Sequence, residues 1–398
     1  MKKNIFNLLG GVLLSLPMLF ASCGNGDNAL EEIINGGGSG SGGGSSTINA
    51  TAIDLDQKMK VLVKGGDALT ITVKFTPSDA TDKTVTWESK DPTIATVENG
   101  VVTPVGLGIT TITAKSGELS ATCEVFVGTE VDLSSKGSDY STNDYDILSG
   151  DIGAYFINIL DNHHVAFNGM ATSKGITCDG DATIILADGS TNTVKGSSYK
   201  AGIVVGPSGT TLTIDAETAG DGKLNATGGS QSAGIGTSYN ASSDITCGAI
   251  TIKGGEITAK GGFCGAGIGT GLTILKNYTC GAITINGGTV TATGGYGAAG
   301  IGTGEADGRS NTCGVIAITA NVTKVTATKG TNSPNSIGKG YNNGGTQNCG
   351  TITFGTASVF DGSAWSPATM VAGTYGGLSL AISTTTNADD TWTLTPAE

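Results

Sequence analysis

The chain has little of what catalysis by side chains usually requires. Its 398 residues include two His and one Arg, and aromatic residues make up only 5%. Pro is also rare, at 8 residues, and the 66 Gly residues follow no Gly-X-Y period, which excludes collagen. An excess of 34 acidic over 21 basic residues gives a net charge of −13, which argues against nucleic acid as a partner. The composition therefore favours a scaffold over an enzyme.

The first 22 residues have the features of a secretory signal. Lys2 and Lys3 precede a short apolar stretch, which small residues follow. The run Leu-Phe-Ala-Ser-Cys at 19–23 resembles a bacterial lipoprotein box, and this resemblance implies lipidation of Cys23. An ordinary signal peptide with a chance cysteine is the alternative. We therefore expect a lipoprotein signal peptide over residues 1–22.

A Gly/Ser-rich segment over residues 23–48 is typical of a flexible tether. Together with Cys23 it resembles the start of surface-exposed lipoproteins of the Bacteroidetes kind. The resemblance implies a secreted, lipid-anchored protein at the outer membrane that faces the cell exterior. The membrane contact is then made through the lipid anchor alone.

Residues 49–128 contain short alternating strands separated by turn residues, which predicts a β-sandwich. The runs Thr-Pro-Ser-Asp-Ala-Thr at 76–81 and Gly-Val-Val-Thr-Pro at 100–104, with 85–97 between them, resemble the bacterial immunoglobulin-like group 2 (Big2) module. Such modules imply a spacer or adhesive role in surface proteins. Trp87 is predicted to be the core indole of this sandwich, with a ligand platform as the alternative.

A repeat of 33 residues dominates the remainder of the chain. The string Cys-Gly-x-Ile-x-Ile (with Phe as the last residue of the fourth copy) begins at Cys247, Cys280, Cys313 and Cys349, and Gly-Ile-Gly or Ser-Ile-Gly recurs in phase with it. Each unit holds three short pieces rich in Ile, Val and Thr, which favours a rung of a β-helix over a pair of helices. The handedness of parallel crossovers predicts a right-handed coil.

The whole chain is thus predicted to be all-β: an N-terminal Ig-like β-sandwich followed by a right-handed parallel β-helix with rungs of ~33 residues. The β-helix spans residues 129–398, with about six rungs and with caps at about 131–170 and 355–398. This segment resembles carbohydrate-binding or adhesin-like β-helix domains of gut-type bacterial lipoproteins.

The recurring cysteines should stack on one another in successive rungs. Buried free thiols are the favoured interpretation, because in-register parallel neighbours rarely orient their side chains for a bond. A disulfide is the alternative, and a metal is disfavoured by the absence of a Cys-x-x-Cys pair. Cys123, Cys178 and Cys264 stand outside this pattern.

The scarce aromatic residues form a candidate ligand-binding surface. Phe263 and Tyr296 occupy the same repeat position, whereas Tyr239, Tyr278 and Tyr341 lie in the loop before each recurring cysteine. A row of exposed rings offers flat apolar faces to a glycan. Packing of the rings at the rung corners is the alternative.

Acidic residues offer a weak candidate site for Ca²⁺. Asp179, Asp181 and Asp188 cluster in the first rungs, although acidic loops are more often merely solvated. No other cofactor and no catalytic residue is predicted. His163 and His164 are interpreted as surface or cap residues.

These features favour an adhesin or glycan-binding protein whose partner is a glycan or a host or bacterial surface. A β-helix polysaccharide lyase or glycoside hydrolase is the alternative. It is disfavoured because Glu256 stacks on Thr289 rather than on a second carboxylate, and because Arg309 lies in a loop. A purely structural stalk or assembly subunit is the second alternative.

Overall fold

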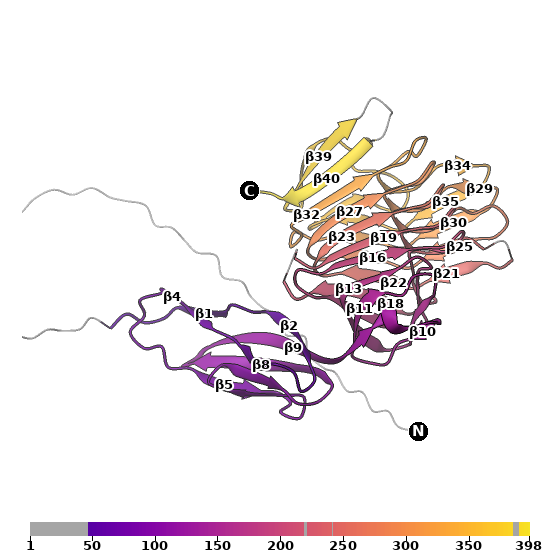
Figure 1. Ribbon diagram of the computed structural model, residues 1–398. Coiled ribbons are helices and arrows are strands. Elements are labelled where there is room, and N and C mark those ends of the chain that lie inside the picture. Colours follow the sequence, from indigo (N-terminus) through magenta and orange to yellow (C-terminus); the bar gives the residue numbers. More distant parts are fainter. Residues whose placement is uncertain (1–46, 219–220, 241, 385–389) are drawn as a thin grey trace, which may run out of the picture. The chain divides into compact units, whose positions relative to one another are not determined.

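A computed structural model describes residues 47–218, 221–240, 242–384 and 390–398, which form two consecutive all-β regions (Figure 1). Among these residues the one helical element is η1 (Leu133–Ser135), a single 3-10 turn. No helix in the described part of the chain is long and apolar enough to cross a membrane. The predicted signal peptide, Cys23 and nearly all of the tether lie outside the described residues.

The first region is a β-sandwich. Its strands are β1 (Ala52–Leu55), β2 (Met59–Val63), β3 (Leu69–Thr70), β4 (Val73–Thr76), β5 (Thr86–Ser89), β6 (Ala95–Glu98), β7 (Val101–Pro104), β8 (Gly108–Ser116) and β9 (Leu119–Asp132). Alternate residues of β8 and β9 point into a core that includes Ile112, Cys123 and Val125. Trp87 packs against this core but is only half-buried.

Strand β9 continues directly from the sandwich into the second region. It pairs with β8 and β2 on the sandwich side, and its last residues pair in parallel with β11 (Asp146–Asp151). A small apolar cluster at this junction contains Phe126, Ile147, Ala166 and Ile185. The two regions are therefore joined by shared hydrogen bonds and shared apolar packing.

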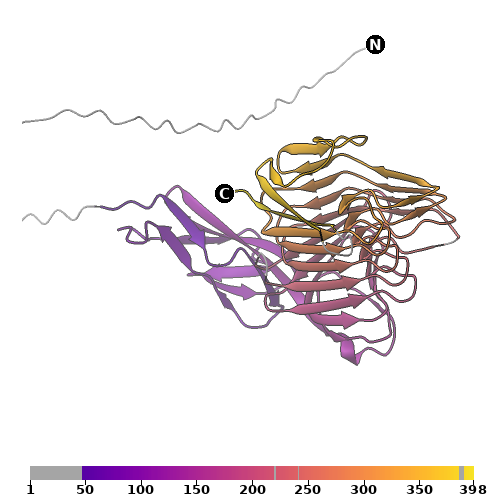
Figure 2. The ribbon, with the colours of Figure 1, turned by 90° about the horizontal axis from the view of Figure 1, so that it is seen from above.

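The second region is a parallel β-helix whose rungs each supply strands to three sheets (Figure 2). Sheet A runs through β11, β13 (His163–Thr172), β15 (Ala182–Leu186), β18 (Thr211–Ala216), β22 (Ala249–Ile252), β26 (Ile283–Ile285), β31 (Ile316–Ile318) and β36 (Ile352–Phe354). Sheet B contains β16 (Thr191–Lys195), β19 (Lys223–Thr227), β23 (Glu256–Lys260), β27 (Thr289–Thr293) and β32 (Lys324–Thr328). These strands are the recurring Ile, Val and Thr pieces of the sequence.

The third sheet runs through the whole stack, and an outer ladder is added in its later rungs. Sheet C contains β10 (Tyr140–Ser141), β12 (Ile157–Ile159), β14 (Ile176–Cys178), β17 (Ile203–Val204), β20 (Ile235–Gly236), β24 (Ile268–Gly269), β28 (Ile301–Gly302) and β33 (Ile337–Gly338). The outer ladder contains β21 (Ile245–Cys247), β25 (Tyr278–Cys280), β30 (Ser310–Cys313) and β35 (Thr346–Cys349), and β29 (Ala306–Asp307) pairs with β34 (Asn342–Asn343) beside it.

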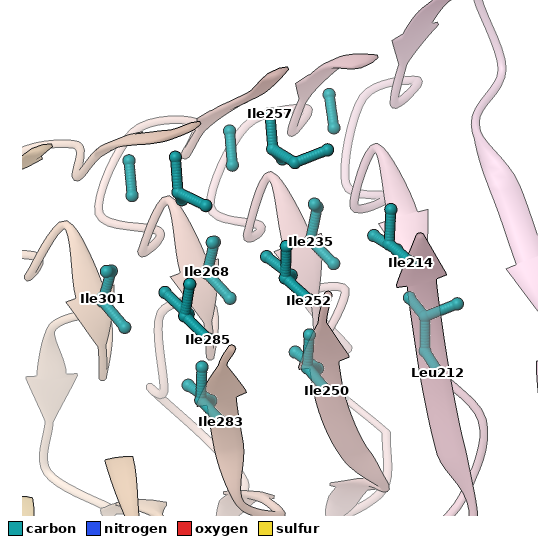
Figure 3. Packing of buried hydrophobic residues seen from close by; sticks show 14 of the residues in the cluster. Leu212, Ile214, Ile235, Ile250, Ile252, Ile257, Ile268, Ile283, Ile285 and Ile301 are labelled. Carbon is teal, nitrogen blue, oxygen red and sulfur yellow. The ribbon is translucent and has the colours of Figure 1, made fainter. Parts of the chain in front are cut away.

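The core of the β-helix is a set of stacked aliphatic side chains (Figure 3). Strict register places Ile250 on Ile283 in sheet A and Ile268 on Ile301 in sheet C, and each of these residues is fully buried. Small, branched side chains of one size fill a narrow interior evenly, so the chain needs few large aromatic residues. The low aromatic content is a consequence of this packing.

The Gly-Ile-Gly motif has a local geometric cause. Gly269 has φ of +133°, and a Cβ there would come 1.8 Å from the carbonyl oxygen of Gly302 in the next rung. Only glycine tolerates both the conformation and the contact. The second glycine of the motif is therefore required at this corner.

The regular stack begins earlier than the sequence pattern indicated. We expected irregular strands and a cap at about 131–170, but β10 and β11 already pair in parallel with β12 and β13 of the following rung. The opposite end is closed by antiparallel strands: β37 (Ala357–Phe360), β38 (Gly373–Tyr375), β39 (Leu378–Thr384) and β40 (Asp390–Pro396).

The recurring cysteines stack in register, as predicted, but the expectation of free thiols is wrong for the first pair. Cys247 and Cys280 form a disulfide with their Cα atoms 4.6 Å apart. That separation lies within the range that a disulfide spans, and stacking of like positions produces it directly. Rung stacking thus brings two sulfurs together although the cysteines are 33 residues apart.

Candidate functional site

Two exposed rings form a stacked pair on one edge of the β-helix. Phe263 is 60% exposed and Tyr296 is 40% exposed. Their centroids are 5.8 Å apart and their planes differ by 15°. This arrangement, called here the ring pair, presents apolar surface to solvent from two neighbouring rungs.

The turn beneath the ring pair explains why both rings point outward. Each ring precedes a residue in the left-handed region, Cys264 with φ of +63° and Gly297 with φ of +68°. Such residues reverse the chain within a tight corner. The same conformation recurs one rung earlier at Gln231.

Cys264 is held in its strained conformation by a partner that the sequence did not reveal. Its thiol donates a hydrogen bond to the Glu305 carboxylate at 2.7 Å, and its carbonyl accepts one from the Glu305 backbone N–H at 3.0 Å. Burial and the adjacent carboxylate raise the pKa of the Cys264 thiol well above its usual range. The thiol therefore remains protonated and serves as a donor that fixes the corner.

A hollow of about 600 Å³ continues the surface from the ring pair toward the C-terminal cap. Asn332 lines this hollow and also donates a hydrogen bond from its side chain to the Tyr296 hydroxyl. Tyr341, which is 38% exposed, and Trp365, from the cap, supply rings to the wall. The ring pair and the hollow thus form one continuous surface.

Polar groups with fixed positions surround the rings of the hollow. The Gln347 amide nitrogen donates to the carbonyls of Gly304 and Tyr341, at 2.8 and 2.9 Å, and its oxygen accepts from Thr303 at 2.5 Å. The Lys339 ammonium lies 5.1 Å from the centroid of the Phe360 ring. Rings beside oriented amides and an ammonium suit a hydroxylated ligand such as a sugar, because such a ligand has an apolar face and polar edges.

The remaining predicted rings lie away from this surface or face inward. Tyr239 is half-buried and packs against exposed Tyr199 with 5.4 Å between ring centroids. Tyr278 was wrongly predicted to be exposed: it is 1% exposed, and its hydroxyl donates to the Asn240 carbonyl at 3.0 Å. Burial raises the pKa of Tyr278 to about 12. Its register partner Ile245 is apolar, which is the signal that could have indicated an inward side chain.

The structure does not assemble the predicted calcium site. Asp179 is exposed, Asp181 accepts a hydrogen bond from the Thr211 backbone, and Asp188 pairs with Lys60 of the sandwich at 3.3 Å. Within the described residues no group of three or more His, Cys, Asp or Glu side chains is placed to hold a metal ion.

Other ionisable groups have structural roles. Glu217 is buried at the junction, where it accepts hydrogen bonds from the backbone N–H groups of Val61 and Asp188 and from Lys60. His163 and His164 lie on β13, where each contacts a neighbouring loop: the His163 ring bonds Thr142 at 2.9 Å and the His164 ring stacks on Tyr145.

Comparison with known proteins agrees with both halves of the architecture. Residues 45–125 match the family model of the bacterial Ig-like domain (group 2). Residues 219–239, 250–272 and 283–305 match the model of the β-helix repeat. The chain combines a group 2 Ig-like domain with a repeat β-helix.

Two curated proteins share a short segment with this chain. A 3-O-alpha-D-galactosyl-alpha-L-arabinofuranosidase of Bifidobacterium longum subsp. longum is 36% identical over 101 residues, which is 24% of this chain and 9% of that protein. An uncharacterized protein of Clostridium acetobutylicum is 42% identical over 83 residues, which is 20% of this chain and 8% of that protein. The similarity spans less than a tenth of either relative.

Proposed function

We propose that this protein is a lipid-anchored cell-surface protein that binds glycans through the β-helix, with the Ig-like domain as a spacer. The observation that carries the proposal is the exposed ring pair, which continues into a hollow lined by rings and amides. Anchorage through Cys23 and an outward-facing location complete the proposal, and both are supported by the lipoprotein-like start of the sequence.

The ring pair suits a sugar because its position is exposed yet fixed. A pyranose ring has C–H groups on its faces and hydroxyls around its edge, so it packs on an aromatic face while its hydroxyls bond to nearby polar groups. The Asn332 contact orients Tyr296, and the left-handed corners fix both backbones. A fixed platform loses little side-chain entropy when a ligand binds.

The glycosidase relative supports the same ligand class. A segment that occupies 9% of a much larger enzyme is expected to be an accessory module rather than its catalytic part. We infer that this segment belongs in both cases to a protein that contacts a glycan, as a substrate in the enzyme and as a ligand here. Binding, rather than bond cleavage, is the activity proposed here.

A glycan array probed with the full chain tests the proposal. We expect retention of a defined set of glycans, and the double variant Phe263→Ala with Tyr296→Ala should weaken it at least about tenfold, or 1.4 kcal/mol. Tyr155→Ala is the matched control, since Tyr155 is 39% exposed but lies in an early rung. Equal binding by the double variant and the parent chain would overturn this site.

The same array distinguishes binding from catalysis. Glycans that are retained should be incubated with the chain and then analysed for new reducing ends and for unsaturated products. A binding protein leaves them unchanged over hours. Release of either product would replace the proposal with a β-helix hydrolase or lyase.

A further inference from the structure

The four recurring cysteines form a continuous stack, which we call the cysteine ladder. Strand register aligns each with the next through β21, β25, β30 and β35. All four side chains are buried against the β-helix core. In each case the register partner of a ladder cysteine is the cysteine of the next rung. The members of the ladder, in order, are Cys247, Cys280, Cys313 and Cys349.

The disulfide between the first two cysteines restricts the pairing of the others. A sulfur that is bonded to Cys247 cannot also bond to Cys313, so Cys280 is unavailable to the third rung. The remaining register partner of Cys313 is Cys349. The ladder thus divides into two successive pairs.

The second pair is already in close contact. The Cys313 and Cys349 sulfurs are 2.7 Å apart. Non-bonded carbon atoms prefer about 3.5–4.0 Å, and sulfur is larger than carbon. Both cysteines end strands that pair in the same parallel register as the first pair, and a glycine follows each of them. The strand register of the first pair is thus repeated two rungs later.

We propose that Cys313 and Cys349 form a second disulfide, so that the cysteine ladder closes two cross-links between successive rungs. The two thiols lose two protons and two electrons as the S–S bond forms. A thiol–disulfide oxidoreductase of the secretory route accepts them, and its own disulfide is reduced to a dithiol. Disulfides persist in such oxidising compartments.

The two cross-links enclose part of the candidate surface, whereas Tyr296 lies between them. The loop closed by the first disulfide contains Phe263, and the loop closed by the second contains Asn332 and Tyr341. With the exception of Trp365, every residue that lines the hollow lies between Cys313 and Cys349. The second disulfide would therefore tie the hollow to the rung beneath it.

The other thiols are placed where they remain free. Cys123 is buried in the sandwich, Cys178 ends β14 in sheet C, and the Cys264 thiol donates a hydrogen bond to Glu305. Thiol counting can therefore separate the possible states of the ladder. Two cross-links leave three free thiols, one leaves five and none leaves seven among the cysteines other than Cys23.

The experiment uses the full chain carrying Cys23→Ser, exported to a bacterial periplasm and denatured without reductant in the presence of a thiol-alkylating reagent. We expect three alkylated cysteines and a non-reduced proteolytic peptide that joins Cys313 to Cys349. Five or seven alkylated cysteines, or a peptide that joins Cys280 to Cys313, would overturn the proposal.

A pair of variants sharpens the count. Cys349→Ser should raise the number of alkylated cysteines from three to four, because Cys313 loses its partner. Cys178→Ser, the matched control, should lower it from three to two. The parent chain alone decides the question if either variant does not fold, and the outcome is independent of glycan binding.

Discussion

The cysteine ladder and the ring pair are made by the same repeat, yet one stack is buried and the other is exposed. Cys280 is 1% exposed, whereas Phe263, earlier in the same 33-residue unit, is 60% exposed. Both stacks follow from parallel register, which sets each side chain above its counterpart. The repeat thus determines which residues are neighbours, and the local turn determines whether they face the core or the solvent.

Buried and exposed positions of the repeat therefore have different roles, the first in stability and the second in ligand recognition. Interior positions stabilise the folded state through burial of apolar surface, at about 25 cal/mol per Å². Exposed positions contribute little to folding but are available to a ligand. The predictions below test this separation, from the largest expected effect to the smallest.

The interior should carry most of the stability. Ile285→Ala removes a fully buried side chain from sheet A and should lower the free energy of unfolding by about 2–5 kcal/mol. Tyr296→Ala, on the exposed edge, should change it by less than about 1 kcal/mol. Chemical denaturation of both variants measures the contrast, and similar losses would show that the ring pair is part of the fold.

The first disulfide should come next in size. Replacing both Cys247 and Cys280 with Ala should reduce the free energy of unfolding by about 2–4 kcal/mol, because the cross-link restricts the unfolded chain. Cys123→Ala is the control, since it removes a buried thiol that forms no disulfide. A double variant no less stable than this control would contradict the expected contribution of the cross-link.

Tyr278 should show a smaller loss of stability than Ile285 or the first disulfide, and it should distinguish the two kinds of position. Tyr278→Phe removes the hydroxyl that bonds Asn240 and should cost about 0.5–1.5 kcal/mol of stability. Glycan retention should be unchanged, in contrast to the variants of the ring pair. Loss of retention without loss of stability would place Tyr278 at the ligand instead.

Much of the architecture was predictable because it follows from the period of the sequence. The recurrence of Cys-Gly-x-Ile-x-Ile fixes the rung length, and Ile at alternate positions fixes the buried face of sheet A. Stacking of Phe263 on Tyr296 follows in the same way, since both occupy one repeat position.

Features that depend on a single rung could not be predicted from the period. Cys264 meets Glu305 across 41 residues, and no repeated pattern relates the two. Trp365 reaches the hollow from the cap, whose strands are antiparallel and non-repetitive. The direction of Tyr278 was missed because its register partners, Ile245 and Asn311, differ in polarity.

The cap at the C-terminal end sets a limit on how the molecule can grow. β40 pairs antiparallel with β32 and β37 pairs antiparallel with β36, so the last strands of sheets A and B have their outward hydrogen bonds occupied. A parallel stack with an open end would template another molecule and lead to fibres. The number of rungs is therefore set by the sequence of one chain and not by end-to-end assembly of several chains. A further 33-residue unit inserted before the cap would lengthen the stack by about 4.8 Å and leave its end closed.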